Sequence, residues 1–303
     1  MTSSTAAPAP RSDETLGLLY GFAGVCIFGL TLPLTRIAVR ELDPLFVSLG
    51  RAVLAGLISA VLLWCSGQPM PTRRQFGKLA IVAAGVVFGF PVLSTIAMRT
   101  APAGHAAIVL ALLPLATAAA SVLFAGERPS LGFWLCGLSG SAAVLVFAAM
   151  EGAFSSAGLA AADVLLAAAI IAAAIGYAQG GALSRDLGGW QVICWALVLS
   201  MPVLAMALAV LAPAMRFQAH WPAWASFLYV AIFSQLIGFF FWNKGLAMGG
   251  VARVGQVQLL QTFVSLAGAA VFTGEVIGWR EAGFALLVVA IVAIGRKMPV
   301  ARA

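Results

Sequence analysis

A stripe of polar side chains lies within a long apolar run in the last quarter of the chain. Gln258, the adjacent pair Gln261 and Thr262, then Ser265 and Gly268 follow one another at intervals of three or four residues, so in a helix they share one face. Amides and hydroxyls in an apolar surrounding need partners, and a polar solute can provide them. The stripe therefore predicts the wall of a solute-binding cavity. For Ser265 the alternative is that a small residue merely permits close packing of helices.

A weaker polar stripe occurs earlier in the chain, at Pro114, Thr117 and Ser121. Pro114 and Thr117 precede Thr262 and Ser265 by 148 residues. This interval predicts that both stripes border the same solute pathway. Close helix packing is again the alternative for Thr117 and Ser121.

Aromatic and amide side chains form a third group of candidates for solute binding. Trp242 and Asn243 lie in the run SQLIGFFFWNKGLAMGG, where rings offer stacking faces and the amide offers hydrogen bonds. Alternatively, Trp242 anchors a helix end at the membrane surface, and we expect Lys244 to extend to the headgroups. Tyr177, in the Gly-rich segment AIGYAQGGA, is a further candidate because its hydroxyl needs a partner and glycines permit close approach.

Three charged residues stand out by position. Arg51 lies about two helical turns inside an apolar run and could bind a substrate carboxylate or extend to the headgroups. Glu127 and Glu275 each follow a glycine at the end of an apolar run. They could hold a gate by pairing with Arg128 or Arg280. The alternative is a solvated turn residue, whose ion pair would contribute little.

Residue types for catalysis or metal binding are scarce. His105 and His220 are isolated from acidic helix partners, and the four cysteines lie inside apolar runs without paired spacing. Neither a metal site nor an acid–base pair is expected. A GxxxxGK[ST] phosphate-binding motif is also missing from the sequence, so ATP is not expected as the energy source. We expect neither an enzyme nor a cofactor.

Composition indicates an integral membrane protein. Hydrophobic residues make up 62% of the chain and charged residues 9%, against about 25% charged residues in ordinary globular domains. The net charge of +7 comes from Lys and Arg that stand singly or in pairs between apolar runs. This distribution favours membrane topology over a nucleic-acid partner, and the lipid bilayer is the expected surrounding.

The fold class that these runs predict is all-α, with ten transmembrane helices. A span needs roughly 20 apolar residues, and Gly and Pro are tolerated within it. The expected spans are residues 16–37, 45–65, 77–98, 104–125, 131–149, 160–183, 190–212, 224–247, 251–273 and 280–296.

Two halves of five spans each are expected, related as an inverted repeat. Residues 98–127 and 246–275 align without a gap and share a Gly-Glu pair and four further identities. Because each half has an odd number of spans, the second copy enters the membrane upside down. Inverted repeats are typical of secondary transporters. The expected domains are 16–150 and 158–297.

Charge asymmetry predicts the orientation. With the N-terminus inside, eleven Lys and Arg outside the spans face the cytoplasm and five face the other side. The excess, including the cluster Arg73, Arg74 and Lys78, places both termini in the cytoplasm. Residues 1–15 are polar and lack the apolar core of a signal peptide. They are expected to be a disordered cytoplasmic tail, and residues 298–303 a second tail.

Helix-breaking residues predict where the helices bend. Gly29, Pro33, Pro91, Pro114 and Gly181 lie inside expected spans and weaken the backbone hydrogen-bond ladder. They are candidate hinges for alternating access. Static curvature that shapes the bundle is the alternative.

The segment from Ala97 to Gly137, AMRTAPAGHAAIVLALLPLATAAASVLFAGERPSLGFWLCG, resembles the EamA pattern of the drug/metabolite transporter superfamily. Small residues open its expected helix, a proline lies in the middle and Gly-Glu closes it. Residues 245–283 follow the same plan, with Thr262 in the place of Pro114. The resemblance covers nearly the whole chain. It implies a ten-helix metabolite carrier, often an exporter, that works by alternating access around a central cavity.

Together these features predict a carrier in the bacterial inner membrane that exports small amphipathic metabolites, namely amino acids including aromatic ones. A multidrug or other metabolite carrier of the same superfamily is the alternative. The expected first span contains no acid, unlike small multidrug carriers, which resemble one another in a glutamate there. A membrane scaffold or a lipid-modifying enzyme is the alternative from another class. The energy coupling and the oligomeric state stay open, and a monomer is compatible with the sequence.

Overall fold

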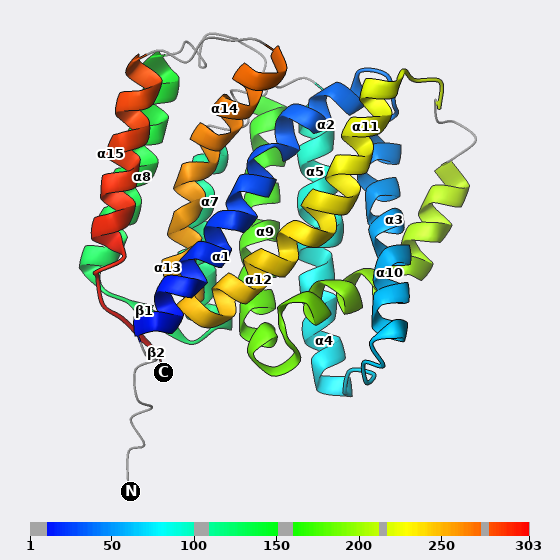
Figure 1. The fold of residues 1–303 in the computed structure, drawn as a ribbon, viewed down its shortest axis with the longest axis horizontal. Helices are drawn as coiled ribbons and strands as arrows, with labels where there is room; N and C mark the ends of the chain where they lie inside the picture. Colours follow the sequence, from blue (N-terminus) through cyan, green and yellow to red (C-terminus); the bar gives the residue numbers. More distant parts are fainter. Residues whose placement is uncertain (1–10, 100–108, 151–159, 212–216, 274–278, 303) are drawn as a thin grey trace, which may run out of the picture.

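The computed structural model describes residues 11–99, 109–150, 160–211, 217–273 and 279–302. Within these ranges the chain is almost entirely helical, as the all-α prediction requires, and the helices pack into a bundle (Figure 1). Besides short turns and connections, the described ranges contain a ladder of two strands.

The helices of the first half match the apolar runs in order. They are α1 (Arg11–Gly29), α2 (Thr31–Val39), α3 (Pro44–Cys65), α4 (Arg73–Val82), the π-helical segment η1 (Ala83–Gly89), α5 (Phe90–Ala97), the 3-10 segment η2 (Leu110–Leu112), α7 (Leu113–Phe124) and α8 (Leu131–Met150). Residues 100–108, including the start of the expected fourth span and His105, lie outside the described ranges.

The second half follows a similar order, except that its first helix is unbroken. It consists of α9 (Ala160–Leu187), α10 (Gly189–Leu211), α11 (Trp221–Tyr229), the π-helical segment η4 (Val230–Ile237), α12 (Gly238–Gly249), α13 (Val251–Gly255), the 3-10 segment η5 (Gln256–Leu260), α14 (Gln261–Thr273) and α15 (Trp279–Gly295).

Six of the described helical stretches are long and apolar enough to cross a membrane. Three shorter apolar helices accompany them, at Leu110–Phe124, Leu131–Phe147 and Ala282–Gly295. Large apolar side chains such as Leu123, Val210 and Leu286 are more than two-thirds exposed. Such exposure is unfavourable in water and suits a surface covered by lipid. The chain is thus a multi-pass membrane protein, while the count of ten spans stays a prediction.

Irregular helical turns recur at the interval that relates the two sequence halves. In the first half the N–H of Phe90 donates to the carbonyl of Gly85, five residues back. In the second half the N–H of Gly238 donates to the carbonyl of Phe233, also five residues back. Both partners are shifted by 148 residues, the interval of the Gly-Glu pairs. The recurrence extends the internal similarity to local backbone geometry, and the inversion of the second half stays a prediction.

Glycines bring α1 and α12 into direct backbone contact. A Cβ atom on Gly245 would lie 2.7 Å from the nitrogen of Gly21 and 2.8 Å from the carbonyl oxygen of Gly17. Real Cβ atoms do not approach backbone that closely, so larger residues there would push the helices apart. This close crossing joins the first helix of one half to the third helical passage of the other.

The first and last described residues lie at one end of the bundle. There α1 begins and α15 ends, beside the strands β1 (Glu127–Pro129) and β2 (Val300–Arg302) (Figure 1). The strands pair antiparallel, with Glu127 opposite Arg302. Residues 300–302, expected to be part of a tail, are therefore ordered as a strand. The helix α1 also begins at Arg11, within the segment expected to be a disordered tail. We call this end of the bundle the termini end.

Candidate functional site

A central cavity lies between helices of both halves. Two adjoining pockets form it and share Leu32, Leu113 and Gln261 in their walls. Polar residues of η5 and α14 line one pocket, namely Gln258, Gln261, Thr262 and Ser265. The other pocket has a mixed wall of Phe28, Thr31, Arg51, Val86, Phe90, Tyr177, Ser234 and Phe239. Four aromatic rings, one guanidinium and several hydroxyl and amide groups thus border one space.

Most residues of the predicted polar stripe line this cavity. The 3-10 segment η5 and the following α14 bring the stripe to its wall. The hydroxyl of Ser265 donates to the carbonyl oxygen of Gly29 at 2.5 Å. That carbonyl is available because α1 ends at Gly29, so the serine joins the two halves at a helix break. Thr262 is buried and Gln261 half-buried.

Gln258 is only partly satisfied by protein groups. Its side-chain oxygen accepts a hydrogen bond from the hydroxyl of Thr117 at 3.4 Å. Its side-chain nitrogen is buried and has no hydrogen-bond partner. A buried donor without a partner costs about 1–3 kcal/mol. Gln258 therefore presents an unused donor beside the cavity.

Thr117, Trp242 and Asn243 lie outside the cavity lining, unlike the other residues predicted to bind substrate. Thr117 is fully buried behind Gln258. Trp242 is also fully buried, and its ring centroid lies 5.4 Å from that of Tyr177 and 6.1 Å from that of Phe28. The side-chain amide of Asn243 donates to the carbonyl of Gly189 at 3.2 Å. Each of the three supports a residue or helix at the site and leaves no free surface toward the cavity.

Arg51 points inward and is 3% exposed. It lies in α3 and borders the cavity together with Tyr177. Its Nε is buried without a hydrogen-bond partner. The alternative that Arg51 extends to the headgroups is wrong, because extension would leave the guanidinium on the outer surface.

A second polar pair at the cavity was not singled out from the sequence. The hydroxyls of Thr31 and Ser234 are 2.8 Å apart and join the start of α2 to η4. Next to Ser234, the amide of Gln235 donates to the carbonyl of Val86 at 3.1 Å. Their polar type within apolar spans is the feature by which the sequence could have identified these residues. The irregular turns that bring them to the cavity are not predictable from the sequence.

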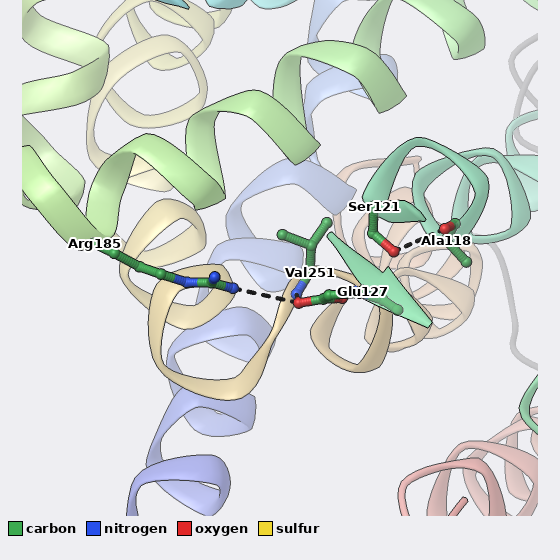
Figure 2. Close-up of polar contacts among 6 residues, drawn as sticks. Ala118, Ser121, Glu127, Arg185 and Val251 are labelled. Atoms are coloured by element: carbon green, nitrogen blue, oxygen red, sulfur yellow. Dashed lines mark hydrogen bonds and ion pairs between the residues drawn. The ribbon is translucent and has the colours of Figure 1, made fainter. Parts of the chain in front are cut away.

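Glu127 forms a buried polar contact at the termini end, which we call the Glu127 latch. One carboxylate oxygen accepts from the backbone N–H of Val251 at 2.8 Å and the other from that of Ala252 at 2.7 Å. Arg185 of α9 lies 3.3 Å from the carboxylate (Figure 2). Glu127 is 1% exposed. An anion is favourable there because these N–H groups begin the helix α13.

Two glycines shape the turns around the Glu127 latch. Gly126, just before Glu127, has φ +65°, and Gly250, just before Val251, has φ +89°. Other residues adopt such φ angles only at a cost of roughly 1–2 kcal/mol. These turns set the glutamate directly against the first N–H groups of α13.

The partners of Glu127 differ from those predicted. It pairs with Arg185, rather than with Arg128 or Arg280, and it is buried, so the alternative of a solvated turn residue is wrong. Ser121, nearby on α7, donates to the carbonyl of Ala118 (Figure 2) and is satisfied within its own helix. Glu275 lies outside the described residues.

Most of the candidate hinge residues lie at helix junctions. Gly29 ends α1, Pro33 follows in the first turn of α2, and Pro91 and Pro114 lie in the first turns of α5 and α7. Proline has no N–H to donate to the preceding turn, so each of these prolines lies where the regular helical hydrogen-bond ladder is interrupted. Gly181 instead lies inside the unbroken α9, where it packs against Leu246.

The described residues contain no group of three or more His, Cys, Asp and Glu side chains that could hold a metal ion. The chemistry of the cavity is therefore that of one guanidinium, neutral polar groups and aromatic rings. Such a wall can hold an amphipathic solute by hydrogen bonds and apolar contact.

Known proteins share this architecture. A family model described as the EamA-like transporter family matches residues 15–149 and 160–295. The uncharacterized transporter YdeK of Bacillus subtilis (strain 168) is 44% identical over 286 residues, which cover 94% of this chain and 99% of the relative. A probable terminal-alkyne amino-acid exporter of Streptantibioticus cattleyicolor is 27% identical over 262 residues, covering 83% of this chain and 84% of the exporter.

A solved crystal structure of a protein superposes with a TM-score of 0.75 at 18% sequence identity. The superposition covers 93% of this chain and 98% of the other. At this level of identity the likeness concerns the fold.

Proposed function

The chain belongs to the EamA-like transporter family of the drug/metabolite transporter superfamily, and on this premise we propose that it exports small amphipathic metabolites, namely amino acids including aromatic ones. The observation that carries this proposal is the central cavity, in which polar side chains of η5 and α14 line one pocket and aromatic side chains line the adjoining one. The polar groups suit the backbone of an amino acid and the rings suit an apolar side chain. The name of the distant relative from Streptantibioticus cattleyicolor adds support for an amino acid as substrate.

We place the termini end in the cytoplasm of a bacterial cell and the protein in the inner membrane, following the excess of Lys and Arg at that end. In the conformation described here the Glu127 latch then closes the cytoplasmic side. It joins the first half, through Glu127, to α9 and α13 of the second half. Breaking these contacts would let the halves separate on that side, as alternating access requires.

The candidate hinges fit this cycle. The break at Gly29 lies next to the cavity residue Thr31, and Pro91 and Pro114 lie beside Phe90 and Leu113. A change in helix direction at these junctions would move cavity residues directly. Because one chain supplies the whole described lining, a monomer would suffice for transport.

Transport in proteoliposomes tests the proposal. Purified protein is reconstituted, and efflux and uptake of a panel of radiolabelled amino acids are measured for wild type, Gln258→Ala and Tyr177→Ala. We expect saturable flux of at least one aromatic amino acid, reduced at least tenfold in both variants. Gly77→Ala is the control, because a Cβ on Gly77 meets no atom within 4 Å.

The same assay, extended to a radiolabelled organic cation, separates the alternatives. Saturable flux of an organic cation but of no amino acid would replace the substrate proposal with a multidrug carrier. Amino acid flux that is unchanged in both cavity variants would instead contradict the placement of the site. Trp242→Ala tests whether transport also depends on a residue that holds Tyr177 in place, since Trp242 contacts Tyr177 but does not line the cavity.

A further inference from the structure

Arg51 is a buried cation without a counter-ion in the part of the chain that the structure describes. It is 3% exposed, and the ion pairs between described residues involve other basic residues. Its Nε is fully covered and makes no hydrogen bond. The guanidinium therefore has unused donor capacity at the edge of the cavity.

A guanidinium in this position calls for an anion. Arginine keeps its charge in proteins, and its planar fork matches a carboxylate with two parallel hydrogen bonds. Leaving a buried charge unpaired is costly, and a partner that arrives with the solute removes this cost in the bound state. A charge retained without a protein partner beside a cavity is therefore a binding group for a negatively charged ligand.

The rest of the cavity lining also favours a negatively charged ligand. The described lining contains no Asp or Glu, so it offers an organic cation no opposite charge. The amide nitrogen of Gln258, in the adjoining pocket, is a second donor without a partner. Two unused donors and no acid select for an anion over a cation.

The apolar part of the ligand is indicated by the rings beside Arg51. Phe28, Phe90, Tyr177 and Phe239 line the same pocket as the guanidinium. The centroids of Phe28 and Phe239 are 5.1 Å apart in an edge-to-face arrangement. These rings form an apolar surface next to a single positive charge. A ligand that matches both has one carboxylate and an apolar or aromatic body.

From this arrangement we infer that Arg51 binds the carboxylate of the transported solute, so that the substrates are monocarboxylates with an apolar body and the amino group is dispensable. The inference rests on the proposed function, because it takes the cavity to be the transport site. It also deepens that function by predicting that organic cations of the same shape are rejected.

Four probes that share a phenyl ring test the inference on the wild-type protein. They are L-phenylalanine, 3-phenylpropionate, which lacks the amine, and phenylalaninamide and phenethylamine, which lack the carboxylate. Binding to full-length protein in detergent is measured by the shift of its melting temperature, which needs no transport. We expect the two carboxylates to bind, and the amide and the amine to bind at least tenfold more weakly. Equal binding by phenethylamine would overturn the inference.

Variants of Arg51 separate charge recognition from structural support. Arg51→Gln removes the charged donor and should weaken the binding of 3-phenylpropionate by about tenfold to a hundredfold. This is the usual contribution of a hydrogen bond to a charged group. Arg51→Lys keeps the charge and should retain part of the affinity. Arg40→Gln is the matched control, because Arg40 is an exposed arginine at the end of α2.

The preference between carboxylate and amide is the readout that a structural role would not change. If Arg51→Gln and Arg51→Lys keep the wild-type ratio of affinities for phenylalanine and phenylalaninamide, the inference fails. If both variants fail to fold, the four probes on wild type still decide the question. Carboxylate binding without amino acid flux would uphold the role of Arg51 and contradict the proposed substrate. Amino acid flux that does not depend on Arg51 would uphold the proposed substrate and contradict the role of Arg51.

Discussion

Replacing Glu127 tests the most completely satisfied charge in the described part of the chain. In Glu127→Ala the backbone N–H groups of Val251 and Ala252 lose their acceptors, while both residues stay buried. Glu127→Gln keeps the shape of the side chain but offers one oxygen for two donors. Arg185→Ala leaves both backbone hydrogen bonds intact and removes the cation, whose side chain is 30% exposed.

The expected effects follow from these contacts. Two buried N–H groups without acceptors cost about 1–3 kcal/mol each, so Glu127→Ala should lose roughly 2–6 kcal/mol of local stability. Glu127→Gln should lose about half as much, since one hydrogen bond can persist. The ion pair with Arg185 is partly exposed and should contribute less than about 1 kcal/mol. The predicted order of damage is therefore Glu127→Ala, then Glu127→Gln, then Arg185→Ala.

Hydrogen–deuterium exchange with mass spectrometry measures this local stability directly. For the peptide that contains Val251 and Ala252, a loss of 2 kcal/mol corresponds to a roughly thirtyfold faster exchange. Arg185→Ala should change the rate by less than about fivefold. Peptides from residues 217–222, at the opposite end of the bundle, serve as the internal control. Unchanged exchange in Glu127→Ala, or an equal effect of Arg185→Ala, would refute the assignment of the backbone hydrogen bonds as the main contribution.

Two further predictions concern helix packing and pH. Gly245→Ala should lower the stability of the purified protein by about 1–3 kcal/mol, because the added Cβ meets backbone of α1; thermal melting checks this, and a loss no larger than that of Gly77→Ala would contradict it. Glu41 accepts hydrogen bonds from the backbone N–H and the Nδ1 of His220, and these contacts lower the pKa of Glu41. Their stabilisation is present above the ordinary pKa of a glutamate and is lost as the pH falls through the lowered value. The protection of the His220 amide, measured as its exchange rate relative to the intrinsic rate at each pH, should therefore decrease in acid more in wild type than in Glu41→Gln, and an equal decrease would contradict this.

The polar stripe shows what a single sequence can predict about such a cavity. Gln258, Gln261 and Ser265 were found from helical periodicity and from the cost of polar groups in lipid, both of which are local properties. The structure places these side chains in the wall of one space. The sequence did not reveal which neighbours lie behind them. Trp242 is an aromatic residue within an apolar span, as a substrate-binding residue could be. In the structure, however, it is fully buried and its ring packs against Tyr177.

The Glu127 latch shows why other contacts escaped prediction. Its main partners are backbone N–H groups of Val251 and Ala252, which every residue except proline carries and which therefore leave no trace in residue types. Arg185 is 58 positions away in the chain, whereas proximity in the sequence favours Arg128, which directly follows Glu127. Likewise, residues 300–302 look like a polar end of the chain, and only the tertiary structure brings them beside β1.

Glu127 and Arg51 together suggest how structural and functional charges can be told apart in this bundle. Both are almost fully buried, at 1% and 3% exposure, and both carry the desolvation cost of a charge. The carboxylate of Glu127 is satisfied by two backbone N–H groups and a guanidinium, so its cost is offset within the protein. The guanidinium of Arg51 has no such set of partners among the described residues and borders a cavity. A purely structural charge would gain by acquiring a protein partner, whereas a binding charge must leave that place vacant for the ligand.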